Sequence, residues 1–185
     1  STTSTSFTDT GLSTNTPRAL VLRATNAIGA GPLSSTTTGY ALSAPPAGSA
    51  VTAVSSPSAT LAWSNQGNPD GTLYEVFFTS VDFTAGPVVF VSTRATSITL
   101  GPLSAATTYQ FRLRSQNGDG VASDFDATIS TFILPPPPRV TIAGVSDGSV
   151  YAAPISPRFE IVDSYLSFST ATLNGSGFVS GSTVS

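Results

Sequence analysis

The chain has 185 residues, few charges and none of several side chains on which catalysis and cross-linking usually depend. It carries ten acidic and seven basic residues, a net charge of -3, and no His, Cys or Met. The seven arginines are scattered, whereas a nucleic-acid surface needs concentrated positive charge, so a nucleic-acid partner is excluded. No apolar run approaches 18 residues, which argues against a membrane span. Without Cys, no disulfide framework is available.

The length exceeds that of one small sandwich domain, so about two domain-equivalents are expected. Because the sequence shows neither a signal peptide nor a Met, we interpret it as a mature or excised piece of a longer product. Ser and Thr are unusually abundant, and their hydroxyls suit exposed strand positions where charge is scarce.

Residues 1–44 carry three strand candidates. These are Ser4–Asp9, Arg18–Thr25 and Pro32–Leu42, and Ala27–Gly31 supplies a turn between the last two. Because this segment matches the later part of residues 45–134 in the repeat described below, it is expected to be the C-terminal part of a β-sandwich.

Residues 45–134 begin with strands whose apolar residues alternate. Val51 and Val54 lie in an opening strand, and Ala59, Leu61 and Trp63 alternate in the next. Trp63 is the only tryptophan, and we expect it to anchor the core.

A turn at Asn65–Gly71 precedes a third strand with Tyr74, Val76 and Phe78 facing inward and Glu75 outside. Val88–Val91 predicts a short edge strand, and Ala122–Ile133 is expected to close the sandwich.

The stretch Thr96–Asn117 contains the clearest local pattern. Ile98 and Leu100 alternate with hydroxyl residues, and Gly101-Pro102 ends that strand because Pro has no N–H to donate. In the strand that follows, Tyr109, Phe111 and Leu113 face one way, and Gln110, Arg112 and Arg114 face the other. We expect Leu103 to fill the corner and the Tyr109 hydroxyl to bind the turn backbone, the tyrosine corner of Greek-key sandwiches.

Residues 12–29 repeat residues 103–120 at an offset of 91, a natural length for a seven-stranded sandwich. Matched pairs are Leu12 and Leu103, Leu20 and Phe111, Leu22 and Leu113, Asn26 and Asn117, and Gly29 and Gly120. Phe7 likewise matches Ile98. Arg18 stands where Tyr109 would be, so the first corner must be built differently.

The Trp63 strand, the Tyr74-Glu75-Val76 strand, the Leu103–Tyr109 corner and the Asn117–Gly120 turn together resemble a fibronectin type III domain. The resemblance covers residues 45–134, and residues 1–44 resemble the last strands of a second such domain. It implies an all-β fold of tandem antiparallel Greek-key sandwiches with the two termini of each domain at opposite ends. It also implies an extracellular or cell-surface location and no catalytic residues.

Residues 135–185 open with a polyproline spacer, Pro135–Pro138, followed by alternation at Val140 and Ile142. The stretch Val145–Tyr151 and the turn Leu173–Gly175 resemble the front half of bacterial immunoglobulin-like surface domains. This part is expected to be a linker and the N-terminal part of such a sandwich.

No catalytic, cofactor-binding or metal-binding residue is predicted. Without His and Cys, nucleophile–base pairs and zinc sites are not available, and the carboxylates fall in turns and on exposed strand faces. Asp119, Asp124 and Asp126 could hold calcium near one end of the sandwich, but solvated turn and edge residues are the favoured interpretation. Asp147 and Asp163 are interpreted in the same way.

Two surface features leave alternatives open. The phenylalanines Phe77, Phe78, Phe83 and Phe90 could in part line a sugar-stacking surface, although a core with one covered edge is favoured. Phe77 is the outward member. Asn174-Gly175-Ser176 is an N-glycosylation pattern, relevant only in a eukaryotic secretory route.

The leading functional hypothesis is a structural section of a long secreted or cell-surface protein, forming a stalk, fibre or adhesin shaft. The alternative is a spacer or accessory module of a secreted polysaccharide-degrading enzyme. The expected partners are copies of the chain itself or neighbouring domains of the same chain, joined head to tail. In that arrangement residues 138–185 of one copy would complete residues 1–44 of the next, with Ser185 near Ser1, and could build a filament.

Overall fold

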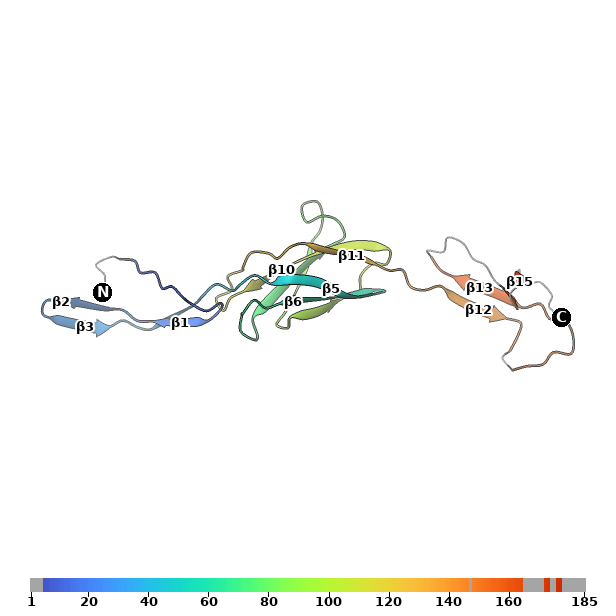
Figure 1. Cartoon of the computed structure of the whole chain (residues 1–185), viewed down its shortest axis with the longest axis horizontal. Coiled ribbons are helices and arrows are strands. Elements are labelled where there is room, and N and C mark those ends of the chain that lie inside the picture. Colours follow the sequence, from blue (N-terminus) through green and yellow to red (C-terminus); the bar gives the residue numbers. More distant parts are fainter. Residues whose placement is uncertain (1–4, 147, 165–171, 174–175, 178–185) are drawn as a thin grey trace. The chain divides into compact units, whose positions relative to one another are not determined.

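The computed structural model describes residues 5–146, 148–164, 172–173 and 176–177 (Figure 1). The chain divides into two compact units, residues 1–134 and 135–185. All the described regular structure is β, in antiparallel pairs. The all-β antiparallel fold predicted from the alternation is therefore confirmed.

The centre of the first unit is a sandwich of two sheets. One sheet has the order β5-β6-β9, formed by Ala47–Ser55, Ser58–Ser64 and Ser97–Leu100. The other has the order β11-β10-β7-β8, formed by Ile129–Ile133, Thr107–Gln116, Leu73–Thr79 and Val89–Thr93. Sequence neighbours β6 and β7 lie in different sheets, as do β8 and β9, which is the Greek-key arrangement expected.

The core lies between these two sheets and comes from alternate residues of their strands. It comprises Ala59, Leu61, Trp63, Tyr74, Val76, Leu100, Leu103, Phe111, Leu113 and Ile133. Trp63 contacts the Tyr74 ring edge-on at a centroid distance of 5.5 Å, a favoured aromatic geometry. Trp63 is thus the core anchor that its position predicted.

The corner between β9 and β10 is the predicted tyrosine corner. The Ser104 backbone N–H donates to the Tyr109 hydroxyl at 3.1 Å, and Leu103 is buried in the core. Ala106 in this corner has a positive φ of 51°. The matched residue of the repeat is Asn15, whose φ is 47°, so the two corners share a backbone shape.

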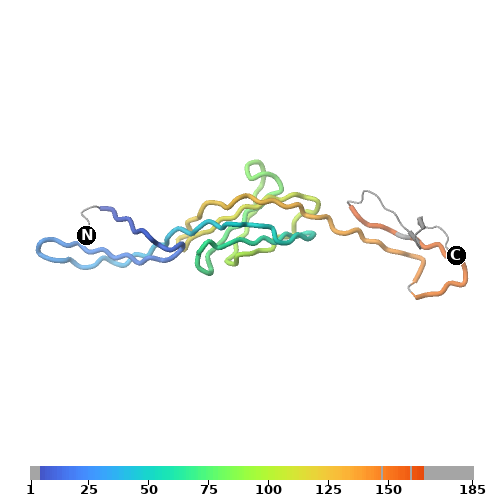
Figure 2. The backbone as a smooth tube through the Cα atoms, in the orientation of Figure 1, coloured from blue at the N-terminus to red at the C-terminus, as the bar shows by residue number. Residues whose placement is uncertain are grey.

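Residues 5–44, called the ribbon below, contain four short strands in two antiparallel pairs instead of three strands. β1 (Pro17–Leu20) pairs with β4 (Thr37–Tyr40), and β2 (Arg23–Asn26) pairs with β3 (Gly29–Leu33). Figure 2 shows the chain doubling back on itself from the β1–β2 half to the β3–β4 half.

None of the three strands predicted in the ribbon has the predicted bounds. The strand predicted at Ser4–Asp9 is not found: the described residues 5–9 form no strand, whereas the matched segment forms β9 by pairing with β6. The strand predicted at Arg18–Thr25 is broken at residues 21–22. There the Leu22 N–H donates to the Ser34 hydroxyl at 2.9 Å, so a side chain replaces a backbone ladder partner.

The strand predicted at Pro32–Leu42 is also divided, because β3 ends at Leu33 and β4 begins at Thr37. The turn predicted at Ala27–Gly31 is shorter than expected, since β3 already begins at Gly29.

The closing strand of the sandwich is shorter than predicted. β11 covers only Ile129–Ile133, and residue Ala122 forms an isolated bridge to Gln116. The segment between them bonds through single contacts, including the Asp126 N–H to the Leu113 carbonyl at 2.8 Å. The predicted edge strand at Val88–Val91 is β8, displaced to Val89–Thr93.

The second unit contains the hairpin of β12 (Arg139–Ala143) and β13 (Arg158–Val162). It also contains the short pair of β14 (Thr172–Leu173) and β15 (Ser176–Gly177). All five residues of β12 are exposed, so the alternation at Val140 and Ile142 does not bury either side chain within this unit. Asp147, Asn174 and Gly175, which belong to the predicted immunoglobulin-like stretches, lie outside the described residues.

Candidate functional site: the joint between ribbon and sandwich

The ribbon meets the central sandwich through a group of buried polar side chains, called the joint below. Its members are Asn15, Ser43, Asn68, Thr72, Ser115 and Asn117, each less than 9% exposed. Buried polar groups are costly unless they are hydrogen-bonded. The hydrogen-bond partners of these six side chains therefore show which segments the joint holds together.

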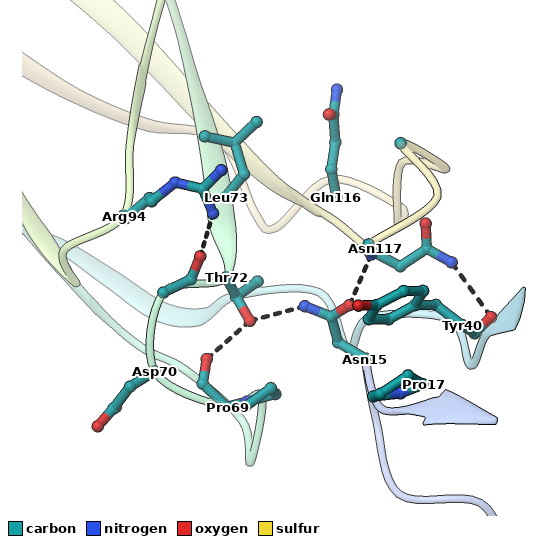
Figure 3. A pocket seen from close by; sticks show the side chains of 13 residues that line it. Asn15, Pro17, Tyr40, Pro69, Asp70, Thr72, Leu73, Arg94, Gln116 and Asn117 are labelled. Atoms are coloured by element: carbon teal, nitrogen blue, oxygen red, sulfur yellow. Dashed lines mark hydrogen bonds between the residues drawn. The ribbon is translucent and has the colours of Figure 1, made fainter. Parts of the chain in front are cut away.

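Asn15 connects three parts of the unit (Figure 3). Its side-chain amide donates to the Thr72 hydroxyl at 2.8 Å, and its carbonyl accepts from the Gly118 N–H at 2.8 Å. Its own backbone N–H donates to the Leu42 carbonyl at 3.1 Å. Asn tolerates the positive φ found here better than most residues, so this residue fits both the corner and the contact.

Asn117 holds the other side of the joint. Its Oδ1 accepts from the backbone N–H groups of Asp119 at 3.1 Å and Val121 at 2.8 Å, which fixes the turn after β10. Its Nδ2 donates to the carbonyls of Tyr40 and Ala41, each at 3.3 Å. The same side chain thus shapes the turn and binds the end of the ribbon.

Two further contacts complete the joint. Asn68 and Ala44 exchange hydrogen bonds at 2.9 and 2.8 Å, an arrangement that copies the pairing of backbone strands. The Ser115 hydroxyl donates to the Ala44 carbonyl at 2.7 Å and contacts the Ser43 hydroxyl at 2.8 Å. Polar networks of this kind fix one geometry, because leaving any member unpaired costs about 1–3 kcal/mol.

Close packing adds to these bonds at Gly118. A Cβ placed on this residue would lie 2.3 Å from the Tyr40 ring, so only glycine lets the ring cover the turn. The Tyr40 N–H also donates to Asp119 Oδ2 at 2.7 Å. The turn after β10 therefore packs closely against β4, the last strand of the ribbon, and hydrogen-bonds to it.

An open cleft of about 460 Å³ lies against the joint and is drawn in Figure 3. It is lined by Asn15, Tyr40, Asp70, Arg94, Gln116 and Asn117, among others. Its charged lining residues are one acid and one arginine, and the arginine donates to the Gly71 carbonyl. A pair of carboxylates, the minimum for acid–base hydrolysis of a glycoside, is not among the lining residues.

The outer face of the β7–β8–β10 sheet carries a second cluster, formed by arginines and phenylalanines. The Arg112 guanidinium lies 4.2 Å from the ring centroids of both Phe83 and Phe125. Arg114 lies 5.0 Å from the Phe77 ring and 5.1 Å from the Phe125 ring. These cation–π contacts hold the loops that carry Phe83 and Phe125 against the sheet.

The four predicted phenylalanines therefore separate into two environments. Phe78 packs against the core, and its centroid lies 6.2 Å from that of Phe111. Phe77 points outward as predicted and stacks on Phe90 at 5.4 Å, while Phe90 remains 58% exposed. Glu75 lies on the same outer face but is buried, because it pairs with Arg114 at 2.6 Å.

The three aspartates considered for calcium do not form one site. Asp119 accepts from the ribbon at Tyr40, and Asp126 accepts from the Ser49 N–H at 3.2 Å and from its hydroxyl. Asp124 is exposed. Within the described part of the chain, no three acidic residues gather as metal ligands would. Asp163 is described, whereas Asp147 and the Asn174-Gly175-Ser176 pattern fall wholly or partly outside the described residues.

Among the described residues, Tyr74 and Asp82 have displaced pKa values, and neither lies beside a second group with which it could carry out acid–base chemistry. Burial raises the pKa of the Tyr74 phenol above its usual value. Hydrogen bonds from the Thr84 side chain and backbone lower the pKa of Asp82 in an exposed loop. The shift of Tyr74 results from its burial in the core, and the shift of Asp82 results from hydrogen bonds within its own turn.

The sequence did not reveal the joint. Asn68 and Asn117 lie in segments identified only as turns, and Asn15 lies in no predicted strand or turn. Their partners across the joint are 24 to 103 positions away along the chain. Such contacts leave no periodic pattern. One signal was present, because Asn26 and Asn117 occupy matched positions of the repeat and both accept turn N–H groups through Oδ1.

No helix in the described part of the chain is long and apolar enough to cross a membrane. Comparison with curated proteins gave no significant match.

Several solved structures are similar to the chain. The fibronectin type III domain of human fibronectin type III domain containing protein 3 is 19% identical, over 51% of this chain and 88% of that chain, with a TM-score of 0.45. The chicken CNTN1 FN1–FN3 domains are 21% identical, over 69% of this chain and 44% of that chain, with a TM-score of 0.43. Titin domains A168–A170 are 28% identical, over 62% of this chain and 40% of that chain, with a TM-score of 0.42.

Residues 44–132 match the model of the fibronectin type III domain family. Domains of this family are generally non-catalytic modules and typically occur in extracellular proteins. With its seven strands β5 to β11, its tyrosine corner and this match, the segment 44–132 is a fibronectin type III domain.

Proposed function

We propose that the chain is a structural section of a long secreted or cell-surface protein, in which β-sandwiches are joined end to end to form a stalk, fibre or adhesin shaft. The observation that carries this proposal is the joint. A chain of modules transmits force and keeps its direction only if consecutive modules are held in a fixed geometry, and the joint supplies fixed contacts.

The strength of the joint comes from its buried and paired polar atoms. Asn15, Asn68 and Asn117 each bind across the boundary between ribbon and sandwich. Every one of these contacts would be lost if the two segments moved independently, leaving buried groups unpaired at about 1–3 kcal/mol each. A flexible linker would not contain such a set.

The repeat supports the same function. The offset of 91 places Asn26 at the tip of the ribbon where Asn117 lies at the tip of the sandwich. An asparagine at the tip that accepts hydrogen bonds from its turn therefore occurs twice in the chain, as expected of similar modules that follow one another. In this proposal residues 1–44 are the closing part of one sandwich, and residues 135–185 are a Pro-rich linker with the opening of an immunoglobulin-like one.

The stiffness of the joint can be measured by electron paramagnetic resonance between two spin labels. The chain contains no Cys, so Thr25→Cys in the ribbon and Ala53→Cys in β5 would be the only labelling sites. Both positions are exposed. We expect a narrow distribution of distances between the two labels in magnetically dilute samples.

The matched variant carries Asn15→Ala and Asn117→Ala in the same labelled chain. It should broaden the distance distribution while the central sandwich stays folded, as reported by Trp63 fluorescence. A broad distribution in the parent chain would contradict the proposal, since it would show that ribbon and sandwich are flexibly linked.

A further inference from the structure

The residue after Asn117 is Gly118, and this pair can react without an enzyme. The backbone nitrogen that follows an asparagine can attack the side-chain carbon Cγ, and a glycine leaves this approach unhindered because it has no side chain. The other asparagines of the joint lack this combination, since Asn15 precedes a β-branched threonine and Asn68 precedes a proline, which has no backbone N–H. Asn117 is therefore the asparagine of the joint that is most prone to deamidation.

Deamidation of Asn117 needs no reagent other than water. A base in solution takes the proton of the Gly118 N–H, and the nitrogen forms a bond to Asn117 Cγ. The Cγ–Nδ2 bond breaks, and the side-chain nitrogen leaves as ammonia after taking a proton from water, so that a cyclic imide remains. Water then opens the ring at either carbonyl and leaves an aspartate or an isoaspartate at position 117. Neither step is an oxidation or a reduction.

The joint restrains each atom that takes part in the first step. The Gly118 N–H donates to Asn15 Oδ1 at 2.8 Å, and this bond must break before the nitrogen can lose its proton. The Asn117 side chain is held at both of its ends, because Oδ1 accepts from two N–H groups of its own turn and Nδ2 donates to two carbonyls of the ribbon. With this side chain only 6% exposed, Cγ is fixed and shielded from solvent.

Three of these five hydrogen bonds come from the ribbon, through Asn15, Tyr40 and Ala41. If the ribbon leaves the sandwich, Nδ2 and the Gly118 nitrogen lose these partners, and only the two bonds of Oδ1 within the turn remain. The ribbon therefore determines whether the reacting atoms are held apart or are free to meet.

The product of the reaction does not fit the closed joint. Nδ2 of Asn117 is a donor to the carbonyls of Tyr40 and Ala41, whereas a carboxylate can only accept. Two carbonyl oxygens would then face a negative charge in a buried place, where an unpaired charge is costly. An isoaspartate would in addition lengthen the backbone of the turn. A chain that has reacted in the open state therefore cannot close its joint again.

From these observations we propose that Asn117 is a site of spontaneous deamidation that the ribbon controls. The closed joint protects Asn117, the open joint lets it react with Gly118, and the product keeps the joint open. The modification thus converts a transient opening into a permanent one. This inference rests on the proposed function, because tension along a stalk would be the event that opens the joint.

The rate of deamidation at Asn117 tests the protection. The full chain is incubated at mildly alkaline pH, folded or unfolded in guanidinium chloride, and the reacted fraction is measured by mass spectrometry of peptides. We expect the folded chain to react at least about tenfold more slowly, because the rate follows the fraction of time in which the joint is open. Asn174, which also precedes a glycine, is the internal reference, and it should react as fast as Asn117 in the unfolded chain.

Asn15→Ala distinguishes the ribbon from the fold in general. It removes the acceptor of the Gly118 N–H, and the folded variant should deamidate at Asn117 about tenfold faster than the folded parent, as expected when one buried hydrogen bond is lost. The matched control is Asn26→Ala, which removes an asparagine at the ribbon tip that accepts bonds only within its own turn. The control should react like the parent, and Trp63 fluorescence verifies that both variants keep the central sandwich.

The product tests the second half of the inference. Chains deamidated at Asn117 gain a negative charge, so ion exchange separates them and mass spectrometry identifies them. In the spin-labelled chain, the deamidated fraction should give a broad distribution of distances and the unreacted fraction a narrow one. Asn117→Asp, made directly, should behave like the deamidated fraction. A narrow distribution in either of these proteins would overturn the inference.

The inference and the proposed function fail through different measurements. Equal rates at Asn117 in the folded and unfolded parent, or equal rates in Asn15→Ala and the folded parent, would overturn the inference while a narrow distance distribution leaves the structural function standing. A broad distribution in the unreacted parent contradicts the structural function itself, whatever the rates are.

Discussion

Asparagine carries the joint because a primary amide both donates and accepts, so one side chain can bind two segments at once. Asn15 binds Thr72 and Gly118, and Asn117 binds its own turn and the end of the ribbon. Gly118 contributes by having no side chain, which leaves room for the Tyr40 ring to pack on the turn. At the first corner, Arg18 replaces the expected tyrosine and pairs with Asp9 at 3.0 Å.

The buried Tyr74 phenol should make the stability of the sandwich depend on alkaline pH. Its pKa is raised by burial, so the folded state holds the proton more tightly than the unfolded chain, whose tyrosines titrate near pH ~10. This contribution is complete below the unfolded pKa and is lost as the pH rises through the folded pKa.

Denaturant unfolding of residues 45–134 between pH 8 and about pH 11 would show this loss, with both pH limits set by the tyrosine range. Tyr74→Phe is the control, because it removes the titrating group and should flatten the curve above pH ~10. An equally steep decline in both proteins would assign the effect to another group.

At the scale of elements, the same sequence pattern forms strands of different length, depending on how many partner strands lie beside it. The residues matched to the ten-residue strand β10 form only the shorter strands β1 and β2 in the ribbon. A strand depends on partner strands for its backbone groups; among the described strands, β10 has one on each side, whereas β1 and β2 each have one. The turn after β10 gains a role that the strand pattern does not reveal, since it holds the last strand of the ribbon.

Gly118→Ala should separate the stability of the joint from that of the sandwich. The added methyl would overlap the Tyr40 ring in the full chain, at a cost of about 1–3 kcal/mol, the usual range for overpacking. In residues 45–134 Tyr40 is missing, and the same change should cost far less.

Both measurements can follow Trp63 fluorescence, which reports the central domain alone because the chain has no other tryptophan. Equal losses in the full chain and in the fragment would show that the glycine is needed by its own turn and not by the joint.

At the scale of the whole molecule, the central sandwich differs from the described residues before and after it in how it buries its apolar side chains. Every residue of the core cluster lies between Ala59 and Ile133, so the sandwich closes its core without help from the ribbon or the second unit. The ribbon and β12 instead leave large apolar side chains exposed. This contrast is what the proposed function expects of a section in which sandwiches follow one another.

Residues 45–134 should therefore fold alone, with one cooperative thermal transition. Trp63→Ala in this fragment should lower the unfolding free energy by about 3–5 kcal/mol, the usual range for removing a large buried aromatic residue. Chemical denaturation of the two proteins measures the difference. A loss below about 1 kcal/mol would show that Trp63 does not anchor the core, since that is the typical effect of an average substitution.

The sequence by itself determined the fold of the central domain, because the information there is local. Alternation at Ala59, Leu61 and Trp63 and at Tyr109, Phe111 and Leu113 defines which residues are buried, and Gly101-Pro102 marks the end of β9. The spacing of Leu103 and Tyr109 defined the corner, and the offset of 91 showed that part of the pattern occurs twice.

Only the tertiary structure decided where the pattern fails and where the joint lies. The ribbon repeats the alternation of a buried strand, yet its leucines are exposed, because burial depends on a second sheet that local sequence cannot supply. The partners of Asn15, Asn68 and Asn117 are likewise distant in sequence and become neighbours only when the strands are in place. Hydrogen bonds between such residues leave no period in the chain, so no local pattern could predict them.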